Sequence, residues 1–486
     1  MSFVFCQGQD INDFQSFREE LRGNFAIERL HYKDRFNNFR DSVNAEYAKF
    51  LGEAWKDFKS MEPISRPKDK TPVAPQPYED DKDTKEPVTI NRPMVVKPQP
   101  KEPQPEPIAP VKVVTPTPTM TVNLDFYGLQ PSVRVPVQSG LKTLNATPQT
   151  ISDAWSTLSG ECWDATLQDC LDIRTRHKLS DWAYLQLLDT VATKVTRNKN
   201  DATLLRAFLF CQSGYKMRLG RSGDSLVMLF GCREQICDVP FFRIDGGMFY
   251  PYGDEPRSLS ICDVAFKGEK SMSLIIHEEQ QLGGGLTDPR TIMSRKYPEI
   301  SVASRVPAAL IEFYNTYPAF LTGNNPLSQW VNYAECPLAD ATKQNLYPIL
   351  RAKLAGDSKA VAAGKLLNWV QTGLKYATDE QVWGYERPFF GEETLFYPYS
   401  DCEDRAVLYA ILVRDLVGLD VALVYYPGHL ATAVNFDTEV GGDSVNIDGR
   451  SFTICDPTYI GAGIGKQMPG LNYDKVEVLL LGKRGS

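Results

Sequence analysis

Histidine is scarce in this chain, and the sequence patterns that indicate common cofactors are missing. Only 4 of the 486 residues are histidine, and the 10 cysteines form neither a CxxC metal pattern nor a dense disulfide framework. We therefore expect mostly buried thiols and no metal. The sequence also lacks a Walker A loop and a dinucleotide-binding fingerprint, so we expect no cofactor. A formal net charge of -8 lacks the basic excess typical of proteins that bind nucleic acid.

Long apolar runs are missing as well. None approaches the roughly eighteen residues that a membrane-spanning helix needs, so we expect no transmembrane segment. Residues 1–10 have a short apolar patch without a charged n-region, which is compatible with the remnant of a signal peptide. With 42% hydrophobic residues, the chain is long enough to bury two or three cores.

The front end of the chain has two parts of different composition. Residues 1–62 contain apolar residues mostly at three- and four-residue steps, which predicts a long amphipathic helix, or two, because Gly23 and Gly52 weaken it. Such a helix could self-associate, pack on the body of the protein or lie on a membrane surface.

Residues 63–118 contain 15 prolines with interleaved charges, and they predict a semi-rigid linker without a core of its own.

The segment YSDCEDRAVLYAILVRDLVGLDV places Cys402 at the start of a predicted helix. Ser400 is a suitable N-cap, Glu403 follows at capping-box spacing, and an apolar face continues until Gly418. The first turn of a helix carries unpaired N–H groups and the positive end of the helix dipole, and both stabilise an anion. Cys402 is therefore a candidate nucleophile, but its acidic neighbours mean that a cation must help, and His429 is the candidate for that cation.

A histidine and an aspartate follow at two predicted strand ends. An apolar run, a turn at Pro427-Gly428 and a second run predict a hairpin whose second strand begins at His429. A further predicted hairpin ends just before Asp456. Neighbouring antiparallel strands could place Asp456 against one imidazole nitrogen and leave the other for Cys402. Each residue type alone is commonly structural, but the combination predicts a catalytic triad.

This order of residues resembles the transglutaminase-like superfamily. The resemblance covers residues 366–459 and includes the upstream segments LLNWVQTGLKY and GYERPFFGEETLFYPYS. It implies a papain-like core, in which a helix packs on an antiparallel sheet. By the same resemblance, Cys402 is the nucleophile, His429 the general base and acid, and Asp456 the residue that orients the imidazole. Members of the superfamily include protein cross-linking enzymes, peptidases and deglycosylating amidases.

The function expected from these residues is thiol-dependent acyl transfer, with hydrolysis of peptide or amide bonds favoured over cross-linking. A protein, a peptide or a cell-wall polymer would be the substrate, and the architecture favours a secreted or periplasmic enzyme. Four upstream residues are candidates to line the cleft or to complete an oxyanion hole, although packing under the helix is an equal alternative. They are Gln381, Trp383, Tyr397 and Tyr399. A binding or scaffolding protein without activity is the competing class.

An internal repeat is a second feature of the sequence. Residues 202–230 align with residues 406–434 without a gap, and Gly214 then stands opposite Gly418. Both segments predict a helix, a glycine stop and two strands, although any unit of that kind would align in this way. In this register the first copy lacks all three triad residues and has Asn198, Ser225 and Gly253 instead.

These observations predict an α+β protein in which a transglutaminase-like core occurs twice, with the first copy degenerate. The expected divisions are the N-terminal helix, the proline-rich linker, a degenerate domain, a β-rich connecting region and a catalytic domain. Their predicted bounds are 1–62, 63–118, 119–257, 258–328 and 329–486.

Overall fold

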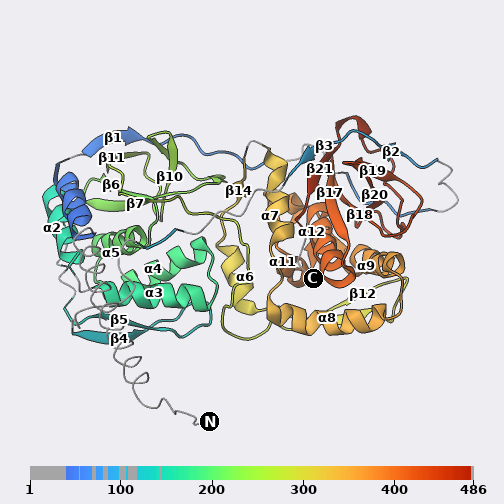
Figure 1. The fold of residues 1–486 in the computed structure, drawn as a ribbon, viewed down its shortest axis with the longest axis horizontal. Coiled ribbons are helices and arrows are strands. Elements are labelled where there is room, and N and C mark those ends of the chain that lie inside the picture. Colours follow the sequence, from blue (N-terminus) through green and yellow to red (C-terminus); the bar gives the residue numbers. More distant parts are fainter. Residues whose placement is uncertain are drawn as a thin grey trace, which may run out of the picture.

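The computed structural model has two lobes that lie side by side along its long axis (Figure 1). The expected α+β class is confirmed, because each lobe combines helices with a largely antiparallel sheet. The structure describes residues 40–53, 55–67, 73–79, 86–97, 105–107, 118–138, 141, 145–160, 163–323 and 325–482. Most of the expected N-terminal helix, its self-association and the signal-peptide remnant fall on residues outside these ranges.

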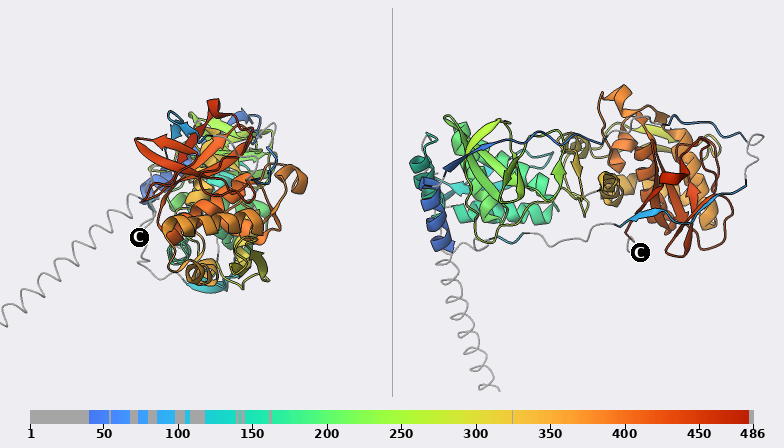
Figure 2. Two further views of the ribbon diagram at one scale, coloured as in Figure 1. Left: turned by 90° about the vertical axis from the view of Figure 1, so that its right-hand side faces the viewer. Right: turned by 90° about the horizontal axis from the view of Figure 1, so that it is seen from above.

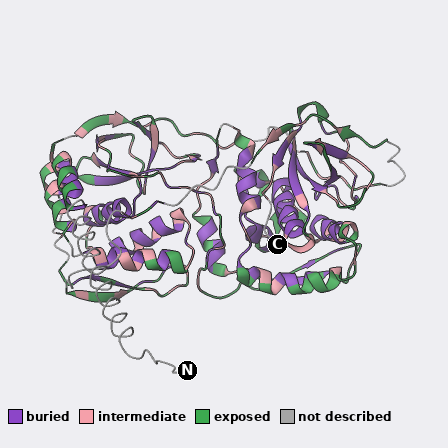
Figure 3. Ribbon diagram, viewed as in Figure 1, coloured by how far each residue is buried: buried purple, intermediate pink, exposed green. Residues whose placement is uncertain are grey.

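The first lobe packs helices against a six-stranded sheet. The helices are α2 (Pro148–Leu158), α3 (Asp164–Arg176), α4 (Asp181–Val195) and α5 (Lys199–Gln212). Neighbouring strands are antiparallel throughout the sheet, whose order is β9 (Phe242–Ile244), β10 (Gly247–Pro251), β7 (Ser225–Gly231), β6 (Met217–Ser222), β11 (Ser258–Cys262) and β1 (Trp55–Lys59). Figure 3 shows that α5 is buried along most of its length, because it lies between α4 and β7.

The second lobe has a seven-stranded sheet, and its helices cover one face (Figures 1 and 2). The strand order is β2 (Thr89–Ile90), β19 (Ser444–Ile447), β20 (Arg450–Cys455), β18 (His429–Asn435), β17 (Asp420–Tyr426), β21 (Glu477–Leu480) and β3 (Met94–Val96). The five central strands pair antiparallel, whereas β2 and β3 add to the two edges in parallel.

One buried helix crosses the sheet of the second lobe. α12 (Cys402–Leu412) packs on β17 and β18, continues as a π-helical turn, η4 (Val413–Val417), and ends at Gly418, whose φ of 71° suits glycine. The other helices of this lobe surround it. They are α7 (Gln329–Glu335), α8 (Asp340–Leu354), α9 (Lys359–Gly373), α10 (Asp379–Val382) and α11 (Gly391–Phe396).

Aromatic side chains join the two lobes through α6 (Ala308–Asn315). The ring of Phe313 lies 5.5 Å from that of Tyr127 in the first lobe, and Tyr314 stacks at 4.1 Å on Phe390 in the second. Large aromatic contacts of this kind bury much apolar area per residue. The hydrophobic core is therefore continuous from one lobe to the other.

The end of the N-terminal region is a strand and not a helix. Residues 40–53 are helical, but Trp55–Lys59 form β1, which pairs with β11 at the edge of the first sheet. Phe58 packs there against the core of the lobe. The spacing of apolar residues alone could not distinguish a helix from a strand here. The strand is stabilised by backbone hydrogen bonds to a sheet edge, which the local sequence does not reveal.

The proline-rich linker is also less independent than expected. Its described parts lie on the two lobes: Ile64 bridges to Cys237 in the first lobe, while β2 and β3 complete the sheet of the second. Short runs between prolines can pair at sheet edges, where a missing N–H group is tolerated. The described parts therefore strap both lobes and do not form a free spacer.

The segment 258–328 does not form one connecting domain. β11 belongs to the first sheet, and the hairpin of β12 (Arg290–Met293) and β13 (Ser301–Ser304) packs against helices of the second lobe. Residues 308–315, which lie in the region expected to be β-rich, form α6. β4 (Thr119–Asn123) pairs with β5 (Ser132–Pro136) in the first lobe, where β5 contacts α3, and so it does not complete a connecting domain.

In the described ranges, no helix has both the length and the apolar character that a bilayer crossing requires. The eight cysteines that the structure describes are all buried free thiols, whereas Cys6 and Cys162 fall outside the described ranges.

Candidate active site

His429 and Asp456 meet at the ends of neighbouring strands. His429 is the first residue of β18, directly after the turn at Pro427-Gly428, where Gly428 has a φ of 86°. Asp456 follows β20, which pairs antiparallel with β18. The register brings the imidazole Nε2 to 2.8 Å from Asp456 Oδ2, and both side chains are buried. The pairing of strands that are distant in sequence therefore creates the contact.

The Asp456 carboxylate is held from its other side by the backbone. Its Oδ1 accepts hydrogen bonds from the N–H groups of Thr458 at 2.9 Å and Tyr459 at 3.2 Å. Gln371 of α9, which the sequence did not single out, donates to the carbonyl oxygens of Asp456 at 2.9 Å and Ala462 at 3.1 Å. The signal available in the sequence was an amide side chain in the mostly apolar run LLNWVQ of α9.

Cys402 is the first residue of α12, and its side chain is largely buried, with 7% of the residue exposed. The N-cap is Asp401, one residue later than the expected Ser400, and its N–H donates to Asp404 at 3.2 Å. The Cys402 thiol donates to Glu403 Oε2 at 3.1 Å. The first turn of α12 therefore holds the sulfur against an acidic neighbour.

The imidazole of His429 also interacts with Cys402. Burial by itself lowers the pKa of His429, but the charge and hydrogen bond of Asp456, with a further contribution from Cys402, raise the pKa to about 10. Nδ1 is buried and makes no hydrogen bond of normal geometry within the part of the chain that the structure describes. Asp456 thus occupies one ring nitrogen and leaves the other for the thiol, which suits a proton-transferring histidine.

Four buried carboxyl groups surround the start of α12. Burial is the main cause of their raised pKa values, to about 9 for Asp379 and about 6 for Asp401, and well above the usual range for Glu403 and Asp404. Oxygens of Asp379, Asp401 and Glu403 lie within 4.8 Å of one another, so these are the residues that could hold a metal ion. The positive end of the α12 dipole opposes a cation there.

Arg405 is a further cation near the sulfur, and the sequence did not single it out. Its guanidinium is buried and donates to Ser400 Oγ at 3.3 Å and to the carbonyl oxygens of Gln371 at 3.3 Å and Leu374 at 3.0 Å. Burial lowers its pKa to about 10, while the charges of Asp401, Asp404 and Cys402 act in the opposite direction. Arg405 therefore offsets part of the negative charge beside the sulfur.

The four predicted cleft residues lie in different environments. Gln381 is exposed, and its Oε1 accepts a hydrogen bond from the Thr378 N–H at 3.1 Å in a capping box of α10. Tyr399 is 41% exposed in β16 (Tyr399–Ser400), which pairs with β15 (Lys375–Tyr376). Trp383 and Tyr397 pack against each other, with ring centroids 5.1 Å apart. A role for any of them in a substrate cleft stays a prediction.

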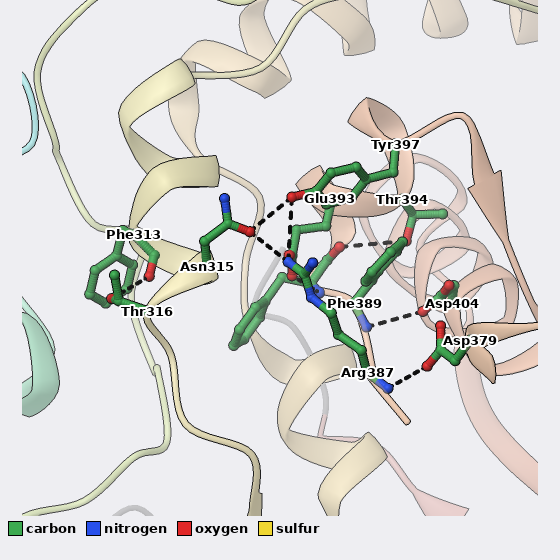
Figure 4. Close-up of polar contacts among 11 residues, drawn as sticks. Phe313, Asn315, Thr316, Asp379, Arg387, Phe389, Glu393, Thr394, Tyr397 and Asp404 are labelled. Carbon is green, nitrogen blue, oxygen red and sulfur yellow. Dashed lines mark hydrogen bonds and ion pairs between the residues drawn. The ribbon is translucent and has the colours of Figure 1, made fainter. Parts of the chain in front are cut away.

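Trp383 and Tyr397 belong to a cluster around Arg387, part of which is drawn in Figure 4. The Arg387 guanidinium lies 4.1 Å from the Trp383 ring centroid and donates to Glu393 Oε1 and Asn315 Oδ1, both at 2.7 Å. The Tyr397 hydroxyl also donates to Asn315, at 2.9 Å. This cluster fixes the segment before α12 to α6.

Replacing Arg387 by alanine should lower the free energy of unfolding by about 3 kcal/mol, because Glu393 would stay buried without its cationic partner. Burial already raises the pKa of Glu393 to about 7, and Arg387 partly opposes that increase. Urea unfolding followed by tryptophan fluorescence would measure the change. Arg295→Ala, at an exposed position, is the matched control, and equal stability of the two variants would contradict a structural role for Arg387.

No family model matches this chain, and no curated protein or solved structure is significantly similar to it. The assignment of function therefore depends on the geometry of the site. That geometry consists of a thiol at a helix start, an imidazole beside it and a carboxylate on the far ring nitrogen.

Proposed function

We propose that the chain is a thiol-dependent acyl-transfer enzyme that hydrolyses peptide or amide bonds. The observation that carries this proposal is the buried 2.8 Å contact between His429 Nε2 and Asp456 Oδ2, with Nδ1 left without a hydrogen bond of normal geometry and Cys402 acting on the same ring. A purely structural histidine in a core commonly has both ring nitrogens satisfied. The vacant nitrogen beside a thiol favours a catalytic role.

In the proposed reaction, the neutral form of His429 accepts the Cys402 proton at Nδ1, which gives a thiolate–imidazolium pair, and the sulfur attacks the carbonyl carbon of the amide. The Cys402 backbone N–H, at the start of α12, is suited to donate to the oxyanion that forms. The imidazolium then protonates the departing amine, which leaves a thioester on Cys402. Water, deprotonated by His429, attacks the thioester and releases a carboxylic acid and the free thiol. Asp456 stabilises the imidazolium in both halves of the reaction.

The hydrogen bond from Cys402 to Glu403 must be broken before this proton transfer. Burial raises the pKa of Glu403, so its carboxyl group is protonated more readily than an exposed one. The S–H must then turn from Glu403 toward the ring.

We also infer that both lobes are copies of a papain-like, transglutaminase-like core. The order β9-β10-β7-β6-β11 in one sheet matches β19-β20-β18-β17-β21 in the other, and a buried helix precedes the central hairpin in each. The π-helical turn after α12 adds one residue relative to α5. Aligning the two N-caps therefore puts Lys199, and not Asn198, in the place of Cys402. Ser225 and Gly253 replace the other triad residues, so we assign catalysis to the second lobe alone.

A non-catalytic binding or scaffolding protein is the second candidate. It is favoured by the small exposed fraction of Cys402 and by the hydrogen bond that the thiol donates to Glu403. An inert buried thiol would have the same two properties.

Alkylation of Cys402 by iodoacetamide separates these candidates without knowledge of the substrate. At pH 7, His429→Ala should slow the alkylation of Cys402 by at least about tenfold. The thiol loses its proton acceptor, and the thiolate that reacts with iodoacetamide loses its counter-ion. Peptide mapping by mass spectrometry would measure the rate at this one cysteine. His177→Ala, at a histidine of the first lobe, is the control and should leave the rate unchanged. An equal rate in wild type and His429→Ala would favour the inert thiol.

A further inference from the structure

The first lobe contains a cavity of about 450 Å³ where the second lobe has its catalytic residues. Its walls come from α4, the start of α5, the start of β7 and the residues after β10. Lys199 and Gly253, which stand in the places of Cys402 and Asp456, both line it, as does Leu226 next to Ser225. The degenerate copy has therefore kept an open site at the same point of the fold.

A buried arginine forms one wall of this cavity. The Arg206 side chain is only 8% exposed, forms an ion pair with Asp189 and lies 4.5 Å from the ring centroid of Tyr252. Its Nη2 donates to Thr203 Oγ1 at 3.5 Å, whereas its buried Nε has no hydrogen-bond partner among the residues that the structure describes. Asp189, Tyr252 and Thr203 fix the position of this guanidinium, and its Nε–H still lacks an acceptor. Such a group is suited to bind the oxygen of a ligand.

The charge of the lining favours an anionic group. The cationic side chains are Arg197, Lys199 and Arg206, and the carboxylates are Asp189 and Asp254. Lys199 and Asp254 form an ion pair, but both side chains are about two-thirds exposed, so that pair is weak in water and can open. The first turn of the 14-residue helix α5 adds the positive end of its dipole.

The rest of the lining favours a peptide over a simple phosphate. The two carboxylates disfavour a dianion and can accept hydrogen bonds from peptide N–H groups. Leu226, Val227 and the ring of Tyr252 supply apolar surface for a side chain or a backbone stretch. Recognition sites for peptides commonly combine apolar walls with a few such polar groups.

We propose that this cavity is a non-catalytic binding site for an acidic segment of a peptide, whose carboxylate is held by Arg206, Lys199 and Arg197. The identification of the ligand as a peptide rests on the proposed function of the second lobe. The site would recognise a stretch of the same substrate chain and raise its effective concentration at Cys402.

The test uses the full chain with Cys402→Ala, so that no peptide is consumed. Isothermal titration calorimetry would compare the peptide acetyl-Ala-Glu-Ala-Glu-amide with its neutral counterpart acetyl-Ala-Gln-Ala-Gln-amide. We expect the acidic peptide to bind at least about tenfold more tightly. The double substitution Arg197→Ala and Lys199→Ala should remove at least tenfold of that affinity, whereas Lys194→Ala, an exposed lysine of α4 outside the cavity, should not change it.

Three results would overturn the proposal. They are equal binding of the two peptides, unchanged binding in the double variant, and full displacement of the acidic peptide by an equal concentration of inorganic phosphate. Because the titration does not require catalysis, its outcome is separate from that of the enzyme proposal. Binding with an inactive wild-type chain would contradict only the enzyme, and an active chain without binding would contradict only the cavity.

Discussion

Replacing Cys402 by alanine should reduce kcat/KM for amide hydrolysis by at least about 10⁴-fold, because the alanine side chain has no nucleophile that can form the acyl-enzyme. The other thiols of the second lobe that the structure describes are Cys336 and Cys455, and neither starts a helix beside His429. The release of new amino termini from denatured casein would measure the activity. Circular dichroism would establish that the variant is folded.

A matched control for this variant is Cys170→Ala, which removes a buried thiol from α3 of the first lobe. It should retain the wild-type rate within about twofold. If Cys402→Ala and Cys170→Ala hydrolysed casein equally well, the proposed nucleophile would be wrong. Incorporation of a dansylated amine into casein, tested in parallel, would reveal a cross-linking activity of the same thioester, because an amine would then replace water as the acceptor.

The substitution Asp456→Asn should have the second largest effect, about 10⁴-fold on kcat, together with a change in the pH dependence of stability. His429 has a folded-state pKa of about 10, raised from its ordinary value of 6.5 mainly by Asp456 against the opposing effect of burial. Its ion pair therefore stabilises the fold fully below about pH 6.5. That contribution, on the order of 4 kcal/mol, is lost as the pH rises toward 10.

Asp456→Asn should remove this dependence. Between pH 6 and pH 10.5, the stability difference between wild type and variant should shrink as the pH rises, and urea unfolding at several pH values would measure it. Asp448→Asn is the matched control, since Asp448 is exposed in the β19–β20 turn and its φ of 50° is one that asparagine tolerates. A stability difference that stays constant over this pH range would contradict a charged pair between His429 and Asp456.

Local patterns were sufficient for the elements that carry the candidate triad. The helix that begins at Cys402 and stops at Gly418, the hairpin that turns at Pro427-Gly428 and the strand before Asp456 all occur as expected. Caps, glycines and β-branched runs act within a few residues of one another, so they can be interpreted without knowledge of the rest of the fold. The one-residue error at the N-cap is of the usual size for a helix end.

Residues that act through long-range contacts were not predictable in this way. Gln371 and Arg405 support the site through backbone carbonyl groups that are 31 to 91 residues away in sequence. Likewise, the partners of β1, β2 and β3 lie hundreds of residues further along the chain. Nothing in the composition of a proline-rich segment indicates which sheet edge it will meet.

The amino-acid sequence by itself determined the α+β class, the absence of a membrane-spanning helix in the described ranges and the local elements that present Cys402, His429 and Asp456. Only the tertiary structure decided that His429 and Asp456 touch, that the described parts of the linker lie on both lobes and that the first lobe has a cavity lined by Arg206. The physical reason is one of range. Backbone propensity and capping are set by near neighbours, whereas strand register, burial and charge pairing depend on which distant segments the hydrophobic core brings together.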